Sequence, residues 1–159
     1  MQVRIVAVGK IKERFLQDGI AEYEKRLRPY VKLEIVEITD EKRGVHASPG
    51  QEQLVKDREG SRILAALPEG AYVVALDVRG KELSSEGLAA RFHDWQIAGT
   101  SSVAMIIGGD LGLSEAVLAR ADLRLSISPM TFTHQMARMI ILEQIYRACR
   151  INSGEPYHK

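Results

Sequence analysis

Residues 104–150 read AMIIGGDLGLSEAVLARADLRLSISPMTFTHQMARMIILEQIYRACR, and this stretch decides the fold. It predicts two short apolar strands, over 103–107 and 123–127, each of which runs into a loop of small residues and then a helix. At the carboxyl ends of parallel strands, loops without bulky side chains let backbone N–H and C=O groups reach a ligand. We therefore predict an α/β fold with a ligand site formed by the loops 108–112 and 128–131.

The rest of the chain repeats the order of strand and helix. Strands are predicted over 3–8, 31–38 and 71–76, helices over 12–27, 51–67 and 84–98, and polar connections at 39–50 and 77–81. The alternation of apolar and charged residues over 31–38 is typical of a strand with one wet face near a sheet edge. With the last third, strand and helix alternate throughout, which predicts a mainly parallel sheet with helices on both faces.

The composition indicates a globular chain in a reducing compartment. A length of 159 residues fits one domain, 1–159, and no apolar stretch approaches the length of a membrane span. The only cysteine, Cys149, cannot form an internal disulfide, so we expect a cytoplasmic protein. The 22 Lys and Arg are balanced by 21 Asp and Glu, so an RNA partner would need a local basic patch. No cluster has metal-ligand spacing, and we expect neither a metal nor a membrane.

The predicted helix 133–150 is apolar on two faces. Ile141, Ile145 and Cys149 share one face, and Met136 and Ile140 lie roughly opposite. A strip marked by Glu143 and Arg147, at i and i+4, is expected to be solvated. A helix with two apolar faces must be covered twice, which predicts a homodimer packed through this helix.

Two groups of residues have both an ordinary and a functional interpretation. The loop Gly108–Gly112 is either a tight turn or a nucleotide loop, and its flanking residues Asp110 and Glu115 favour a ligand with hydroxyls or positive charge over a phosphate. His134 and Arg138, at i and i+4, either reach solvent at the helix end or point at a ligand or a partner subunit.

The carboxyl-terminal residues Tyr157, His158 and Lys159 also allow two interpretations. A chain end is normally frayed. These three side chains nevertheless supply a stacking ring, a base near neutral pH and a cation that can reach a phosphate.

Several segments together resemble one family: AVGK at 7–10, AEYEKRL at 21–27, LSSEGLA at 83–89, IGGDLG at 107–112, LSISPMTFTHQMARMIILEQIYRA at 125–148 and PYHK at 156–159. The chain resembles, from end to end, the ribosomal RNA large subunit methyltransferase H family, whose members are small SPOUT, or α/β-knot, methyltransferases. The resemblance implies S-adenosylmethionine as methyl donor and N3 of a pseudouridine in 23S rRNA of the assembled ribosome as acceptor. It also implies a homodimer and a deep trefoil knot in the last third of the chain.

The resemblance further implies roles for individual residues. Cofactor contacts carried over by position fall on Leu76, Gly108, Ile127, Ser128, Pro129, Met130, Thr131 and Phe132. His158 is the candidate base for the N3 proton, with Tyr157 as its neighbour. Arg138 and Lys159 would hold phosphate or stabilise developing negative charge. Two alternatives stay open at this point: a non-catalytic nucleotide-binding module and a ribosome-binding factor, each of doubly wound α/β type.

Overall fold

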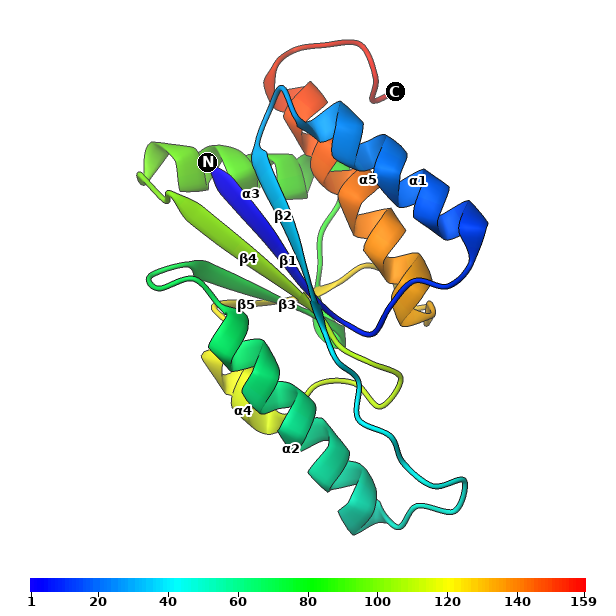
Figure 1. The fold of residues 1–159 in the computed structure, drawn as a ribbon. Helices are drawn as coiled ribbons and strands as arrows, with labels where there is room; N and C mark the ends of the chain where they lie inside the picture. The colour runs from blue at the N-terminus through cyan, green and yellow to red at the C-terminus, as the bar shows by residue number, and fades with distance from the viewer.

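The protein contains one five-stranded sheet with helices on both faces (Figure 1). A computed structural model describes all of residues 1–159. The elements are β1 Gln2–Val8, α1 Arg14–Leu27, β2 Lys32–Ile38, α2 Pro49–Ala66, β3 Tyr72–Glu82, α3 Ser85–Ile97, β4 Ser102–Ile107, α4 Glu115–Arg120, β5 Leu123–Ser126 and α5 His134–Asn152. The strands are all parallel, in the order β2-β1-β4-β3-β5. The predicted fold class is confirmed, and β2 is an edge strand as its alternating pattern indicates.

The central strands are apolar because both of their faces are buried. In β1, Val3 and Ile5 face the cluster beneath α1, α3 and α5, whereas Val6 and Val8 face the cluster beneath α2 and α4. All four are at most 1% exposed. Side chains in a strand alternate between faces, so one continuous apolar run serves two cores.

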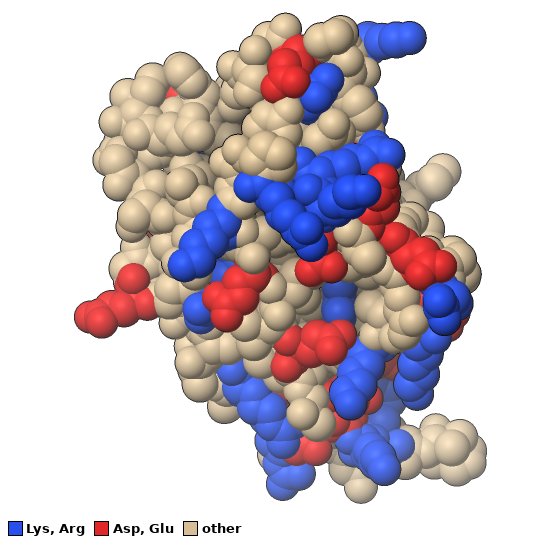
Figure 2. Space-filling model, turned by 45° about the horizontal axis from the view of Figure 1, so that its top comes forward, with Lys and Arg blue, Asp and Glu red and all other residues tan.

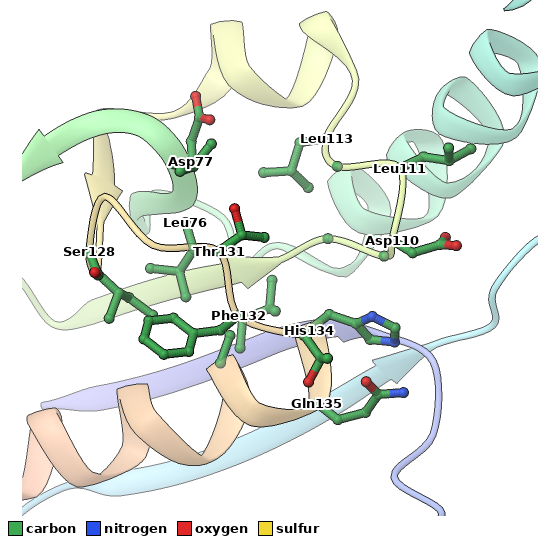
Figure 3. Close-up of a pocket in the computed structure, with 18 of the residues that line it drawn as sticks. Leu76, Asp77, Asp110, Leu111, Leu113, Ser128, Thr131, Phe132, His134 and Gln135 are labelled. Carbon is green, nitrogen blue, oxygen red and sulfur yellow. The ribbon is translucent and has the colours of Figure 1, made fainter.

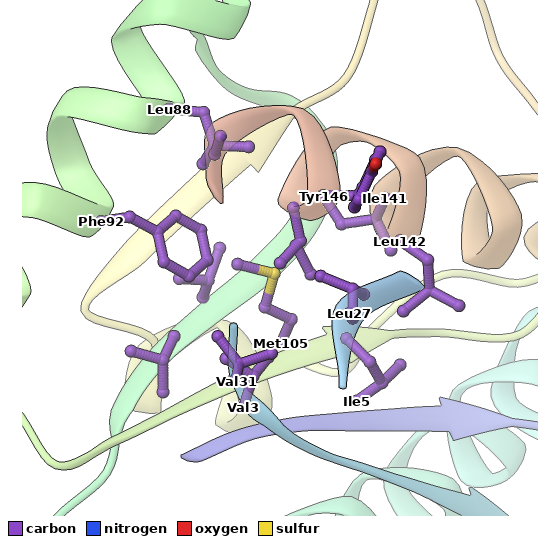
Figure 4. Packing of buried hydrophobic residues seen from close by; sticks show 14 of the residues in the cluster. Val3, Ile5, Leu27, Val31, Leu88, Phe92, Met105, Ile141, Leu142 and Tyr146 are labelled. Atoms are coloured by element: carbon purple, nitrogen blue, oxygen red, sulfur yellow. The ribbon is translucent and has the colours of Figure 1, made fainter. Parts of the chain in front are cut away.

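The larger core lies on the face that α1, α3 and α5 cover. Figure 4 shows Leu27, Phe92 and Tyr146, one from each helix, around Met105 of β4. Met105 is completely buried. Burial of a side chain of this size contributes about 2 kcal/mol to the free energy of unfolding.

Side-chain caps set the starts of four helices. Ser84 accepts a hydrogen bond from the backbone N–H of Gly87 at 3.0 Å, so α3 begins where the predicted helix 84–98 begins. Ser48 forms a capping box with Gln51, so α2 begins at Pro49, inside the stretch predicted as a polar connection. Caps of this kind satisfy N–H groups that the first turn leaves without a partner.

Residues 77–81 were predicted to form a polar turn after the third strand, but in the structure they lie within β3. Leu76 and Lys81 both pair with Leu125 of β5, so β3 continues to Glu82 and Asp77–Gly80 form a bulge within it. A Cβ added at Gly80 would lie 2.6 Å from the backbone carbonyl carbon of Arg124. The bulge therefore requires glycine at its last position.

The strip of α5 that contains Glu143 and Arg147 is not solvated, contrary to its prediction. The side chains of these two residues are 18% and 24% exposed, because the carboxyl-terminal tail, residues 153–159, folds back on them. The tail is thus packed, through Tyr157, and not frayed.

The second apolar face of α5 is partly covered within the chain. A Cβ at Gly19 would lie 2.5 Å from Met139 Sδ, so α1 approaches α5 closely there, and α3 packs along α5 as well. Cys149 packs against the core, and burial raises the pKa of its thiol to about 11. The two-faced pattern by itself therefore does not require a partner subunit, and the homodimer stays a prediction.

We predict that Gly80→Ala destabilises the protein by roughly 1–3 kcal/mol, because its Cβ overlaps the backbone of β5, which cannot move without shifting the sheet. Urea unfolding followed by circular dichroism measures this change. Gly44→Ala is the matched control, since nothing lies within 4 Å of its added Cβ, and we expect a change within about 0.5 kcal/mol. Equal midpoints for the two variants would contradict the close β3–β5 contact.

Candidate active site

A cavity of about 660 Å³ opens at the carboxyl ends of β3, β4 and β5. Every residue predicted to contact the cofactor lines it except Pro129, namely Leu76, Gly108, Ile127, Ser128, Met130, Thr131 and Phe132. Figure 3 shows the loop with Ser128 and Phe132 facing the loop with Asp110 and Leu113. The sheet thus brings together residues from three separate parts of the chain.

The glycine loop approaches the cavity with its backbone. A Cβ at Gly108 would lie 2.8 Å from Leu113 Cδ2, so a larger residue would displace Leu113. Gly112 has a φ of +85° and donates a hydrogen bond from its N–H to the carbonyl oxygen of Gly109 at 3.0 Å. Arg43 holds Asp110 with two hydrogen bonds, at 3.0 and 3.2 Å. The loop is therefore a preformed turn.

The loop between β5 and α5 is held by its own hydroxyl groups. Ser126 Oγ donates to the carbonyl oxygen of Ser128, and the Ser128 hydroxyl accepts from the N–H of Met130, both at 3.0 Å. Thr133 then caps α5. Met130 and Phe132 stay 75% and 39% exposed, so apolar side chains are available at the mouth of the cavity.

The cavity lining is negatively charged. It includes the carboxylates of Asp77 and Asp110 and contains no Lys or Arg. Burial lowers the pKa of His134, the other titratable lining residue, so its imidazole is neutral at neutral pH. Carboxylates in a partly apolar cavity favour a ligand that carries positive charge and disfavour a phosphate.

Arg138 lies outside this lining. Its side chain is 3% exposed and donates to Glu37 Oε2 at 2.7 Å and to the carbonyl oxygen of Gly9 at 2.9 Å. It therefore ties α5 to the ends of β1 and β2. With so little exposed surface, Arg138 cannot offer its guanidinium to a phosphate in this arrangement.

The tail forms a network at the other end of α5. Tyr157 donates to Glu143 Oε1 at 2.9 Å, and burial raises the pKa of its phenol to about 12. His158 lies between Arg147 and Glu86. Its Nδ1 is 3.2 Å from Arg147 Nη1, and its Nε2 is 2.7 Å from Glu86 Oε1. Lys159 is exposed and makes no ion pair.

No residue of the tail lines the cavity within one chain. The cavity adjoins the first turn of α5, and the tail leaves its last turn (Figure 1). The tail then folds back along α5 as far as Glu143. The structure thus unites the predicted cofactor residues but does not bring His158 to them.

Sequence reasoning missed several lining residues, among them Asp77, Leu113 and Gln135. Asp77 immediately follows Leu76, and Leu113 immediately follows the glycine loop. Both could have been predicted as lining residues because they adjoin predicted contacts. No sequence signal marked Gln135, because its contact with the cavity depends on how the first turn of α5 packs against the sheet.

The chain has neither a metal-binding cluster of side chains nor a membrane-spanning helix. No group of three or more His, Cys, Asp and Glu side chains lies close enough together to hold a metal ion. None of the helices combines the length and apolar character needed to cross a membrane.

Known proteins resemble this chain over its whole length. The family model described as "Predicted SPOUT methyltransferase" matches residues 1–158. A protein of Methanoregula boonei is 72% identical over the full length of both chains. Proteins of Bifidobacterium adolescentis and Clostridioides difficile, each named ribosomal RNA large subunit methyltransferase H, are 55% and 56% identical over the full length of both chains.

A solved structure is similar in fold. It is described as a "Probable Methyltransferase" of Bordetella pertussis Tohama I and superimposes with a TM-score of 0.57 at 14% identity, covering 93% of this chain and 96% of the other. Together with the full-length family match and the parallel sheet, the comparisons lead to one conclusion. The chain belongs to the SPOUT methyltransferase family.

Proposed function

We propose that this protein transfers a methyl group from S-adenosylmethionine to N3 of a pseudouridine in large-subunit ribosomal RNA of the assembled ribosome. The observation that carries the proposal is the cavity at the carboxyl edge of the sheet. It is formed by the two loops that most resemble the methyltransferase H family, and its lining is acidic. The names of the relatives support ribosomal RNA as the substrate class.

The residues of the cavity fit this cofactor. A volume of about 660 Å³ lies within the usual range of roughly 300–1,000 Å³ for sites of small ligands. Leu76, Ile127 and Phe132 offer apolar surfaces for an adenine ring, and Gly108 leaves room for close backbone contact. Asp77, which forms no ion pair, offsets positive charge of the sulfonium or ammonium group, whereas Asp110 is already paired with Arg43. When bound, the cofactor supplies an electrophilic methyl group.

The acceptor requires a base. N3 of a pseudouridine carries a proton and lies between two carbonyl groups, so it must lose this proton as it attacks the methyl group. We assign proton removal to His158. Tyr157, whose phenol stays protonated at neutral pH, positions the tail through Glu143 and by edge-on contact with Tyr146, at 4.9 Å between ring centroids. Lys159 is free to contact phosphate.

These roles need two copies of the chain. Pairing two α5 helices antiparallel about a two-fold axis brings the tail of one copy toward the cavity of the other. His158 must then release Arg147 or Glu86, because both of its ring nitrogens are engaged within the chain. Half-exposed Met136 and Ile140 on α5 and exposed Met130 and Phe132 supply apolar surface for such a contact. The proposed active site therefore combines the cavity of one subunit with His158 of another.

The first experiment is transfer of labelled methyl from S-adenosylmethionine to intact ribosomes and, in parallel, to naked rRNA. We expect label in the ribosome sample, at a nucleoside that mass mapping identifies as N3-methylpseudouridine. Cofactor binding without label in either sample would contradict the enzyme and support a nucleotide-binding module. Ribosome binding without cofactor binding would support a non-catalytic ribosome-binding factor.

We predict that His158→Gln lowers kcat on the order of a hundredfold or more, because the variant cannot accept the N3 proton. Its Kd for S-adenosylmethionine, measured by calorimetry, should match the wild type. His93→Gln, an exposed residue of α3, is the matched control and should retain full activity. Normal turnover of His158→Gln would refute the assigned base.

The two-copy site makes a further prediction for mixed dimers. Gly108→Val should abolish cofactor binding, because its side chain would meet Leu113 and the backbone of Gly112. Co-expression of Gly108→Val with His158→Gln should restore about one quarter of the wild-type activity, since half of the dimers then hold one intact site. If both halves of the site came from one chain, activity would stay absent.

A further inference from the structure

A second cavity, of about 360 Å³, adjoins the proposed cofactor cavity. The two share a wall that contains Leu76, Asp77, Leu111 and Leu113. The second cavity differs in charge, because Lys56, Arg79 and Arg124 line it and Asp77 is its only acidic residue. A ligand that spans both cavities thus passes from an acidic to a basic region.

The fold creates this basic cavity locally. Arg79 lies in the β3 bulge Asp77–Gly80, and Arg124 lies on β5 beside it. The absence of a side chain at Gly80 lets the bulge touch the backbone of Arg124. Lys56, from the middle of α2, supplies the third positive charge from the face of the sheet that α2 covers.

The three basic side chains have no acidic partner. None of them forms an ion pair. By contrast, Arg120, the last residue of α4, is paired with Asp122 at 3.3 Å. Asp77 accepts a hydrogen bond from the backbone N–H of Arg79 at 3.1 Å and does not pair with its guanidinium. Elsewhere basic and acidic side chains are interspersed, as on the face in Figure 2, and many are paired. Unpaired positive charge in a concave site attracts anions.

We propose that Lys56, Arg79 and Arg124 bind backbone phosphates of the substrate RNA next to the nucleotide that is methylated. The inference rests on the proposed function and identifies the surface that holds the RNA. Arginine binds phosphate oxygens through two parallel N–H donors, and exposed Arg79 and Arg124 are free to do so. A phosphate held here lies across the shared wall from the methyl donor, so an adjacent base can enter the cofactor cavity.

The charge division between the cavities supports this assignment. Phosphates are disfavoured in the first cavity, whose lining includes Asp77, which forms no ion pair, and contains no Lys or Arg. They are favoured in the second, where three positive charges face one carboxylate. A local site of this kind lets a chain with a net charge of only +1 bind RNA.

The test compares Arg79→Ala/Arg124→Ala with the wild type in binding to intact ribosomes at several salt concentrations. We expect Kd to rise on the order of tenfold near 0.1 M salt, and the slope of log K against log salt to fall by about 0.7 for each phosphate that the variant no longer neutralises. Methyl transfer at subsaturating ribosome concentration should fall by a similar factor, with little change in kcat. Both side chains are exposed, so the variant should fold normally.

Arg28→Ala/Lys32→Ala is the matched control. It removes the same amount of charge from exposed residues at the opposite end of the sheet, where they line another surface cavity. We expect ribosome binding close to that of the wild type. An equal loss of affinity in both double variants would show that net charge alone matters and would overturn the site.

The remaining outcomes separate this proposal from the proposed function. If Arg79→Ala/Arg124→Ala weakens the binding of S-adenosylmethionine alone, these side chains serve the cofactor carboxylate, and the phosphate site is refuted. Unchanged ribosome affinity would refute it too. If the wild type binds ribosomes without transferring methyl, and the variant loses this binding, the phosphate site stands and the proposed methylation fails.

Discussion

The packing of α5 on the sheet is the interaction on which the rest of the structure depends. Ile141, Leu142 and Ile145 are at most 1% exposed between the sheet and the flanking helices α1 and α3. Each contributes about 2 kcal/mol by burial. Arg138 locks the first turns of the same helix to β1 through the carbonyl oxygen of Gly9. With α5 fixed, the loop that enters it must cross the carboxyl edge of the sheet, and the tail that leaves its last turn folds back on Glu143 and Arg147.

The loops at the carboxyl ends of β3, β4 and β5 form two neighbouring cavities with different charge. The glycine loop after β4 and the loop after β5 leave an acidic, apolar-walled space suited to a small cationic ligand. Arg79, in the β3 bulge, lines the second cavity together with Arg124 and does not line the first. Small residues make both arrangements possible, because Gly108 and Gly80 stand where any side chain would meet neighbouring atoms. A single sheet edge thereby separates a site for a cation from a site for a polyanion.

Much of the fold and of the cavity could be predicted from the sequence. Continuous apolar runs predict buried strands such as β1, and alternation of apolar and charged residues predicts the edge strand β2. The cofactor residues were predictable by resemblance, since both loops keep the motifs of the family. The prediction of a turn at 77–81 was wrong. A polar segment looks the same in sequence whether it ends a strand or forms a bulge, and here β3 resumes its pairing with β5 after the bulge. The solvated strip on α5 was wrong because the tail that covers it is polar in sequence and is held by Tyr157 and His158 contacts.

The sequence by itself determined the order and type of the elements, the parallel sheet and the family, because periodicity, caps and motifs are local properties. Only the tertiary structure decided which distant residues meet. It paired buried Arg138 with Glu37, 101 positions away, and brought Arg79 and Arg124 to the lining of one cavity. It also folded the tail back on α5, where Tyr157 donates a hydrogen bond to Glu143 and His158 contacts Arg147. Contacts of this kind depend on the packing of whole elements against each other, which no short stretch of sequence encodes.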